Sequence, residues 1–152
     1  MSIGYILLVE DREEDIELTL RAFKKAHLGN EIVVKRDGLE AITFLEGLAG
    51  DGTMARQPPT LILLDVSMPR MSGIEVLESI RKMPHLRCVP VVMLTSSNEE
   101  RDLIASYEHG ANSYVRKPVA FVDFTSLIEQ LGMYWVVTNE VPSSQMQSSR
   151  ET

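Results

Sequence analysis

The sequence predicts an α/β protein in which one five-stranded parallel sheet carries helices on both faces. Two observations lead to this fold class. Short runs of Ile, Leu and Val recur along the chain without polar alternation, which is typical of strands covered on both faces. Between these runs lie segments whose apolar residues follow the period of a helix. Strand and helix alternate five times, which implies right-handed crossovers and a doubly wound parallel sheet.

Five segments are expected to form the strands. Three of them are compact apolar runs, at Ile3–Val9, Thr60–Leu64 and Val89–Leu94. Two weaker segments fit Glu31–Lys35 and Ser113–Val115. Each run is short enough for a strand and too short for a helix of ordinary length.

The segments between the strands carry apolar residues at helical spacing, mostly at i, i+4 and i+7. In chain order these stripes are Ile16, Leu20 and Phe23; Ala41, Leu45 and Leu48; Gly73, Leu77 and Ile80; Leu103 and Tyr107; and Phe121, Phe124, Ile128, Leu131 and Trp135.

The chain has the length and composition of one globular domain. We expect that domain to cover residues 1–138, with a loop at residues 50–59 and a polar tail at residues 139–152. The net charge is −7 and no cluster of Lys or Arg is present, which disfavours nucleic acid as a partner. Cys88 is the single cysteine and is expected to be a small, partly buried side chain.

No secretory signal and no membrane span are expected. The N-terminus lacks a basic segment followed by a long apolar one, and no apolar run approaches the roughly 20 residues that cross a bilayer. We therefore expect a cytoplasmic protein without a membrane partner.

Polar residues of a particular kind follow four of the predicted strands. Glu10 and Asp11 come after the first strand, Asp65 after the third, Thr95 after the fourth and Lys117 after the fifth. Ligands of such sheets bind at the carboxyl ends of the strands, so these side chains are expected to meet there.

Three converging carboxylates would repel one another unless a cation or a proton relieved them. Mg²⁺ prefers carboxylate and phosphate oxygens, Lys117 adds a positive charge and Thr95 adds a hydroxyl donor. This set suits the stabilisation of charge on a transferring phosphoryl group, and Asp is a known nucleophile in such transfers. Taken singly, each residue has an ordinary explanation as a helix cap or a turn residue.

The motifs at these strand ends resemble the receiver domain of two-component response regulators. They are ILLVED at 6–11, LILLDVSMPRMSG at 61–73, PVVMLTS at 90–96 and HGANSYVRKP at 109–118. The resemblance covers about residues 5–134. It implies a flavodoxin-like (βα)5 fold with strand order 2-1-3-4-5, and a signalling protein that is phosphorylated rather than a turnover enzyme.

The resemblance also assigns roles to the strand-end residues. Asp65 would be the phosphoacceptor, and Asp11, Asp65 and the backbone carbonyl of Ser67 would bind Mg²⁺. Glu10 would act through metal-bound water, and Lys117 would pair with the acids and then with the phosphoryl group. Two structural positions are implied as well: Gly73, eight residues after the acceptor, and Pro118, preceded by a cis peptide bond.

The resemblance further implies a switch made by Thr95 and Tyr114. The phosphoryl group would attract the Thr95 hydroxyl, and Tyr114 would turn inward to fill the vacated space, altering the face formed by the fourth helix, fifth strand and fifth helix. Ser67 and Ser97 would flank the path of the hydrolytic water, and neither supplies a carboxylate or amide to orient it.

A narrower resemblance is to the small receivers paired with bacterial phytochrome histidine kinases. It is carried by the loop GDGTMARQPP, the stretch SSNEERDLIASYEHGANSYVRKP and the ending GMYW. It implies a phytochrome-type histidine kinase as phosphodonor and a homodimer formed through the switch face. Candidate contacts, each with a role in the core as the alternative, are Tyr107, Phe121, Phe124, Met133 and Trp135.

The residues argue against three alternative functions. A binding module that has lost phosphorylation usually lacks one of the acids or the Lys, whereas this chain has all of them. A phosphatase with an aspartyl-phosphate intermediate would place a second Asp two residues after the nucleophile, where this chain has Ser67. A flavin-binding protein would need a phosphate-binding loop after the first strand, where this chain has EDREED.

Overall fold

The computed structural model describes residues 4–49, 56–96 and 99–140. Five parallel strands form one sheet in the order β2-β1-β3-β4-β5, which confirms the predicted fold and strand order. The strands are β1 (Ile6–Val9), β2 (Ile32–Lys35), β3 (Leu61–Leu64), β4 (Val91–Thr95) and β5 (Ser113–Arg116).

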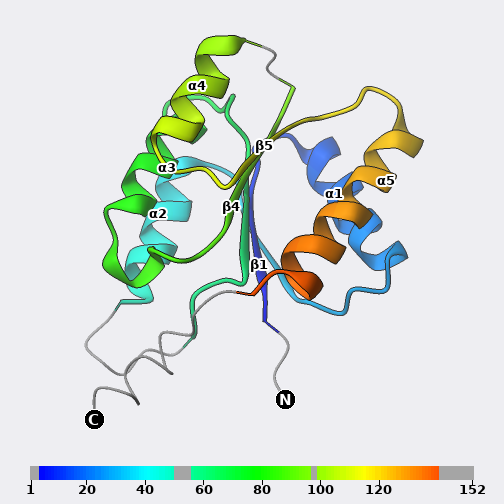
Figure 1. The fold of residues 1–152 in the computed structure, drawn as a ribbon, viewed down its shortest axis with the longest axis horizontal. Coiled ribbons are helices and arrows are strands. Elements are labelled where there is room, and N and C mark those ends of the chain that lie inside the picture. Colours follow the sequence, from blue (N-terminus) through cyan, green and yellow to red (C-terminus); the bar gives the residue numbers. More distant parts are fainter. Residues whose placement is uncertain (1–3, 50–55, 97–98, 141–152) are drawn as a thin grey trace.

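Five α-helices cover the two faces of this sheet. They are α1 (Glu13–Lys25), α2 (Gly38–Gly47), α3 (Gly73–Arg81), α4 (Glu100–Glu108) and α5 (Phe121–Gly132). Helices α2, α3 and α4 lie on one face, and α1 and α5 lie side by side on the other (Figure 1). A 3₁₀ turn (Pro84–Leu86) leads from α3 towards β4.

The core consists of two apolar layers, one on each face of the sheet. Leu7 and Leu64 point to the α2–α3 layer, whereas Ile6 and Leu63 point to the α1–α5 layer. All four side chains are fully buried. The central strands are therefore apolar at every position, which is why their sequences show no alternation.

Two of the predicted helical stripes do not face the core along their whole length. Leu20 of α1 is 37% exposed, and Leu103 and Tyr107 of α4 are 37% and 50% exposed. In α1 the buried side of the helix passes instead through Ile16 and Thr19. Helix α4 carries one fully buried position, Ser106, so its apolar side chains are largely available at the surface.

The end of the last helix differs from the prediction of one continuous helix reaching Trp135. Helix α5 ends at Gly132, and the chain continues as a π-helical segment, Met133–Thr138. Gly132 sits where α5 meets α1, and a Cβ atom there would collide with the side chain of Leu28. None of the described helices is long and apolar enough to cross a bilayer.

Candidate phosphoacceptor site

The acidic residues converge because the two strands that precede them are neighbours in register. Val9 at the end of β1 pairs with Leu64 at the end of β3, so the residues that follow both strands lie at one sheet edge. Carboxylate oxygens of Glu10, Asp11 and Asp65 lie within 4.8 Å of one another. Glu10 and Asp65 are 2% and 4% exposed, so this acidic cluster is largely removed from solvent.

Lys117 reaches the acidic cluster from the end of β5. Its backbone N–H donates a hydrogen bond to the carbonyl of Thr95, 2.7 Å away, which ties the segment after β5 to the end of β4. Its ammonium Nζ lies 2.5 Å from Glu10 Oε1 and 3.5 Å from Asp65 Oδ2. The Lys117 side chain is 7% exposed, so the pairing takes place in a poorly solvated site.

The prediction of a cis peptide bond before Pro118 is wrong for this structure, in which the Lys117–Pro118 bond is trans. The trans form of an X–Pro bond is intrinsically favoured by about 0.5–1 kcal/mol. Lys117 reaches Glu10 and Asp65 with the bond in this form, so the observed contacts do not require the cis isomer.

The electrostatics of the site follow from burying more carboxylates than cations. Burial, and then the neighbouring charge of Asp65, raise the pKa of Glu10 from 4.5 to about 7, against the opposing effect of Lys117. Burial disfavours the charged ammonium of Lys117, but Asp65 and Glu10 outweigh it and raise the pKa of Lys117. The site thus holds its lysine charged while one of its acids is poised to take a proton.

The donor set fits a hard divalent cation. Asp11 Oδ1 is buried and has no hydrogen-bond partner within the part of the chain that the structure describes. An unpartnered buried carboxylate oxygen is costly, and a cation next to it removes that cost. Together with Asp65, this oxygen provides the hard ligands that Mg²⁺ or Mn²⁺ takes in proteins.

The loop after β3 holds Asp65 in place through its own backbone. The N–H of Ser67 donates to Asp65 Oδ1 at 3.2 Å, and the N–H of Gly73 donates to the carbonyl of Val66 at 2.9 Å. A Cβ atom at Gly73 would collide with the backbone carbonyl of Asp65. Ser72 starts α3 with a capping box and so fixes the far end of this loop.

Thr95 and Tyr114 lie on one face of the sheet. Thr95 is fully buried at the end of β4, two residues beyond Met93, and Met93 pairs with Tyr114 of β5. Since side chains alternate along strands, all three point to the same side, where Tyr114 packs half-buried against the α2–α3 core layer. Ser97, the other predicted residue of this region, lies outside the described residues.

The sequence analysis missed two residues of the site, both in or next to the first turn of α1. Asp15 Oδ2 lies 2.8 Å from Lys117 Nζ, and the backbone N–H of Arg12 donates to Glu10 Oε2 at 3.2 Å. The stretch EDREED at 10–15 could have indicated Asp15, because a helix that begins at Glu13 has Asp15 in its first turn. Of its acids, the sequence motifs assign only Glu10 and Asp11 to the site.

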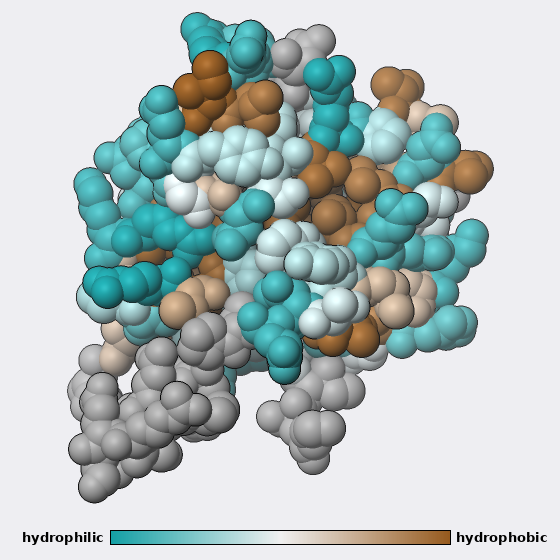
Figure 2. All heavy atoms as spheres, viewed as in Figure 1, coloured by the Kyte–Doolittle hydropathy of each residue, from teal (hydrophilic) through white to brown (hydrophobic). Residues whose placement is uncertain are grey.

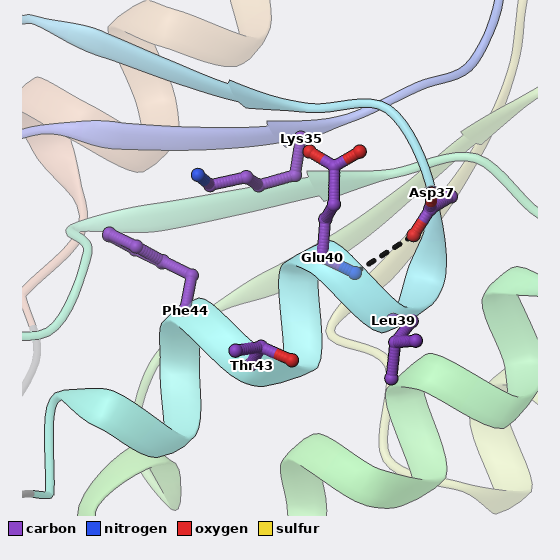
Figure 3. Close-up of a pocket in the computed structure, with 6 residues that line it drawn as sticks. All are labelled: Lys35, Asp37, Leu39, Glu40, Thr43 and Phe44. Atoms are coloured by element: carbon purple, nitrogen blue, oxygen red, sulfur yellow. Dashed lines mark hydrogen bonds between the residues drawn. The ribbon is translucent and has the colours of Figure 1, made fainter.

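A separate pocket lies at the end of β2 and the start of α2, and no residue of the acidic cluster lines it (Figure 3). Its volume is about 430 Å³. Asp37 caps α2 by accepting from the N–H of Glu40 at 2.8 Å, and Lys35 lies 5.2 Å from the centre of the Phe44 ring. These groups serve local structure, so the chemistry of the protein is expected at the acidic cluster instead.

Comparison with known proteins agrees with this geometry. The response regulator receiver domain family matches residues 6–129. The chain belongs to this family. The acidic cluster after β1 and β3 is therefore the metal-binding acidic site of a receiver, and the protein is a response regulator of two-component phosphorelay signalling.

Several relatives match over nearly their whole length. Response regulator Rcp1 of Synechocystis sp. is 38% identical over 140 residues, which is 91% of this chain and 93% of Rcp1. The structure of the phosphorylated cyanobacterial phytochrome response regulator RcpA has a TM-score of 0.84 at 34% identity and covers 93% of this chain and 100% of RcpA.

Two further solved structures are similar. The Mn²⁺-bound form of Rcp1 has a TM-score of 0.81 at 38% identity, over 92% of this chain and 99% of that one. The bacteriophytochrome response regulator AtBRR has a TM-score of 0.69 at 46% identity, over 92% of this chain and 100% of that one. This receiver is thus similar to phytochrome-associated response regulators over almost all of its described length.

Proposed function

We propose that this receiver takes a phosphoryl group from a sensor histidine kinase onto Asp65. In the transfer, an Asp65 carboxylate oxygen forms a bond to phosphorus, the P–N bond of a phosphohistidine breaks, and the histidine nitrogen takes up a proton. The observation that carries the proposal is the buried cluster of three carboxylates with Lys117 at the carboxyl edge of the sheet. The phosphorylated state of the relative RcpA supports it.

Among the three acids, Asp65 has the surroundings of the acceptor. Glu10 is occupied on both oxygens, by Lys117 and by the N–H of Arg12. Asp65 lies 3.5 Å from Lys117, close enough for the ammonium to pair with a phosphoryl oxygen attached there. Asp11 has the unpartnered oxygen and is better suited to hold a cation.

Mg²⁺ is the proposed cofactor, held by Asp11, Asp65 and the backbone carbonyl of Ser67, with Glu10 contributing through a bound water. When bound, it would neutralise the acids and the phosphoryl oxygens. The Mn²⁺-bound form of Rcp1 supports a divalent ion in such a site. The other contributions to catalysis are proposed to come from Lys117, from the hydroxyl of Thr95 and from the backbone of the loop after β3.

The output is proposed to be a change of the α4–β5–α5 face driven by Thr95 and Tyr114. Both residues lie on the same face of the sheet, and Tyr114 is half-buried against the α2–α3 core layer. A change at the end of β4 would thereby reach β5 and the neighbouring α4. We propose that the signal passes from this face by protein contact.

A homodimer through this face is part of the proposal. Apolar side chains gather on the surface over α4, where Leu103, Ile104 and Tyr107 are exposed (Figure 2). Met133 is 50% exposed, in agreement with a contact role, whereas Phe124 is 3% exposed and belongs to the core. Trp135 packs partly buried against the α1–α5 layer, and the side chain of Phe121 lies outside the described ones.

The phosphodonor is proposed to be a phytochrome-type histidine kinase acting in the cytoplasm. The relatives named as phytochrome and bacteriophytochrome response regulators support this pathway, because they match 93% and 92% of this chain rather than the shared motifs alone.

Intact-mass measurement after incubation with acetyl phosphate and Mg²⁺ tests the function directly. Wild-type protein should gain the mass of one phosphoryl group, and EDTA should abolish the gain. Asp65→Asn should gain nothing, whereas the matched variant Asp37→Asn, whose carboxylate caps α2, should gain as wild type does. Absence of modification in wild type, both with acetyl phosphate and with a phosphorylated kinase, would contradict the proposal.

A further inference from the structure

We propose that Asp15 is a positioning residue that holds the Lys117 ammonium in a resting position, in competition with the phosphoryl group. The inference rests on the proposed function of Asp65 as phosphoacceptor. It concerns how readily the site changes from its resting to its phosphorylated arrangement.

The distances around Lys117 define the resting position. Its Nζ is hydrogen-bonded to Glu10 at 2.5 Å and to Asp15 at 2.8 Å, but lies 3.5 Å from Asp65. The ammonium is therefore bound more closely by the two accessory acids than by the proposed acceptor. In the proposed competition, the ammonium lengthens its contact with Asp15 as it moves towards a phosphoryl oxygen on Asp65.

Asp15 is better placed than Glu10 to release the ammonium. Its side chain is 18% exposed, against 3% for Glu10, so water can replace the lost hydrogen bond. Asp15 also lies in the first turn of α1, where the helix dipole stabilises a negative charge. The Arg12 guanidinium, 4.0 Å from Asp15 Oδ2, offers a second cation.

The side chain of Asp15 belongs neither to the candidate metal ligands nor to the hydrogen bond that Asp15 makes within α1. Within the described residues, the carboxylates that could share a cation are Glu10, Asp11 and Asp65. The hydrogen bond that Asp15 makes inside α1 uses its backbone carbonyl, which accepts from Thr19 Oγ1 at 2.7 Å. Asp15→Asn therefore weakens the hold on Lys117 without removing a metal ligand or the hydrogen bond from Thr19.

Beryllium fluoride, which attaches to a carboxylate as a phosphoryl mimic, tests this role. Isothermal titration calorimetry would measure its affinity at saturating Mg²⁺, and the affinity for Mg²⁺ alone, in wild type, Asp15→Asn and Asp15→Glu. The control is Glu14→Gln, which removes one exposed acid from the same helical turn. Asp15→Ser takes the place of Asp15→Asn if the latter does not fold.

The expected result is that Asp15→Asn binds beryllium fluoride about three- to tenfold more tightly than wild type, the net effect of one hydrogen-bonded ion pair that is partly exposed to water. Its Mg²⁺ affinity should stay close to that of wild type. Asp15→Glu should restore the wild-type value, and Glu14→Gln should change it by less than about 1.5-fold, the effect of a screened surface charge.

Unchanged or weaker binding of beryllium fluoride by Asp15→Asn would overturn the inference, since a merely structural role predicts weakening of both affinities. An equal gain in Glu14→Gln would also overturn it, because net charge would then be the cause. Failure of wild type to bind beryllium fluoride and to be modified by acetyl phosphate would overturn the proposed function itself.

Discussion

At the scale of single residues, the buried carboxyl of Glu10 makes the stability of the protein depend on pH. Its pKa rises from 4.5 to about 7 on folding, so the folded state holds the proton more tightly than the unfolded state between these values. The stabilisation is complete below about pH 4.5 and is lost as the pH rises through 7. Bound Mg²⁺ would oppose this loss, because it favours the ionised carboxyl.

We predict that Glu10→Gln removes this pH dependence in metal-free protein. The free energy of unfolding of wild type should fall by about 2 kcal/mol more than that of the variant between pH 5 and pH 8. Urea denaturation in EDTA at several pH values measures the difference. Glu17→Gln, a change at an exposed acid of α1, should keep the wild-type slope; equal slopes in wild type and Glu10→Gln would contradict the prediction.

A second prediction for a single residue concerns Gly73. A methyl group there meets the backbone carbonyl of Asp65, which cannot give way as a flexible side chain would. Gly73→Ala should therefore lower the free energy of unfolding by about 1–3 kcal/mol and reduce phosphorylation at Asp65. Chemical denaturation and intact mass measure the two effects.

The matched control is Gly47→Ala, because a Cβ atom at Gly47 of α2 meets nothing within 4 Å. This change should stabilise the protein by up to about 1 kcal/mol, the ordinary difference in helix propensity. If Gly73→Ala stabilised the protein as Gly47→Ala is expected to, the close approach of α3 to the loop after β3 would not require glycine at position 73.

At the scale of elements, helix α1 ends in a way that a sequence pattern alone would not suggest. The N–H of Leu28 donates to the carbonyl of Phe23 and that of His27 to the carbonyl of Lys24, the two bonds of a Schellman motif. This motif requires a left-handed residue, and His27 occupies it with φ of 58°. Glycine would take that conformation without strain.

His27→Gly should therefore raise the free energy of unfolding by about 1 kcal/mol. Ala26→Gly, one residue earlier and with φ of −77°, should lower it by a similar amount. Thermal and urea denaturation of the two variants provide the comparison. Destabilisation by both changes would mean that the His27 side chain contributes more than the backbone strain costs.

The helices and strands differ in how far the sequence could predict them. The strands were predictable because β1, β3 and β4 are buried on both faces and so are apolar at every position. The change to a π-helix after Gly132 was not, since Trp135 continues the helical spacing of α5 across that glycine.

The residues of the acidic site also differ in how far the sequence could predict them. Residues directly after a strand, such as Asp65 and Lys117, were predictable because parallel strands bring their carboxyl ends to one edge. Asp15 was predictable only as a residue in the first turn of α1, because its contact with Lys117 depends on how far the Lys117 side chain reaches. The isomer of the bond before Pro118 depends on the tertiary fold, which motifs do not encode.

For the molecule as a whole, the proposed dimer can be tested by substituting exposed apolar side chains of α4. We predict that phosphorylated protein self-associates and that Ile104→Glu with Tyr107→Glu prevents association while leaving phosphorylation unchanged. Both side chains are about half exposed, so the charges should be tolerated in the monomer. Sedimentation velocity with and without acetyl phosphate measures the association.

The control for this surface is Leu39→Glu, on α2, where the side chain is 67% exposed but lies on a different part of the protein. It should associate as wild type does. If the α4 double variant still associated, the contact would lie elsewhere, and loss of association in both would point to a general effect of added charge.

We expect Asp65, and not either neighbouring acid, to carry the phosphoryl group. Borohydride reduction of protein treated with acetyl phosphate and Mg²⁺ converts an aspartyl phosphate to homoserine, and peptide sequencing by mass spectrometry then finds the modified position. We predict homoserine at position 65 and unmodified Glu10 and Asp11. Modification at position 11, or none at all in protein that has gained the phosphoryl mass, would contradict the account.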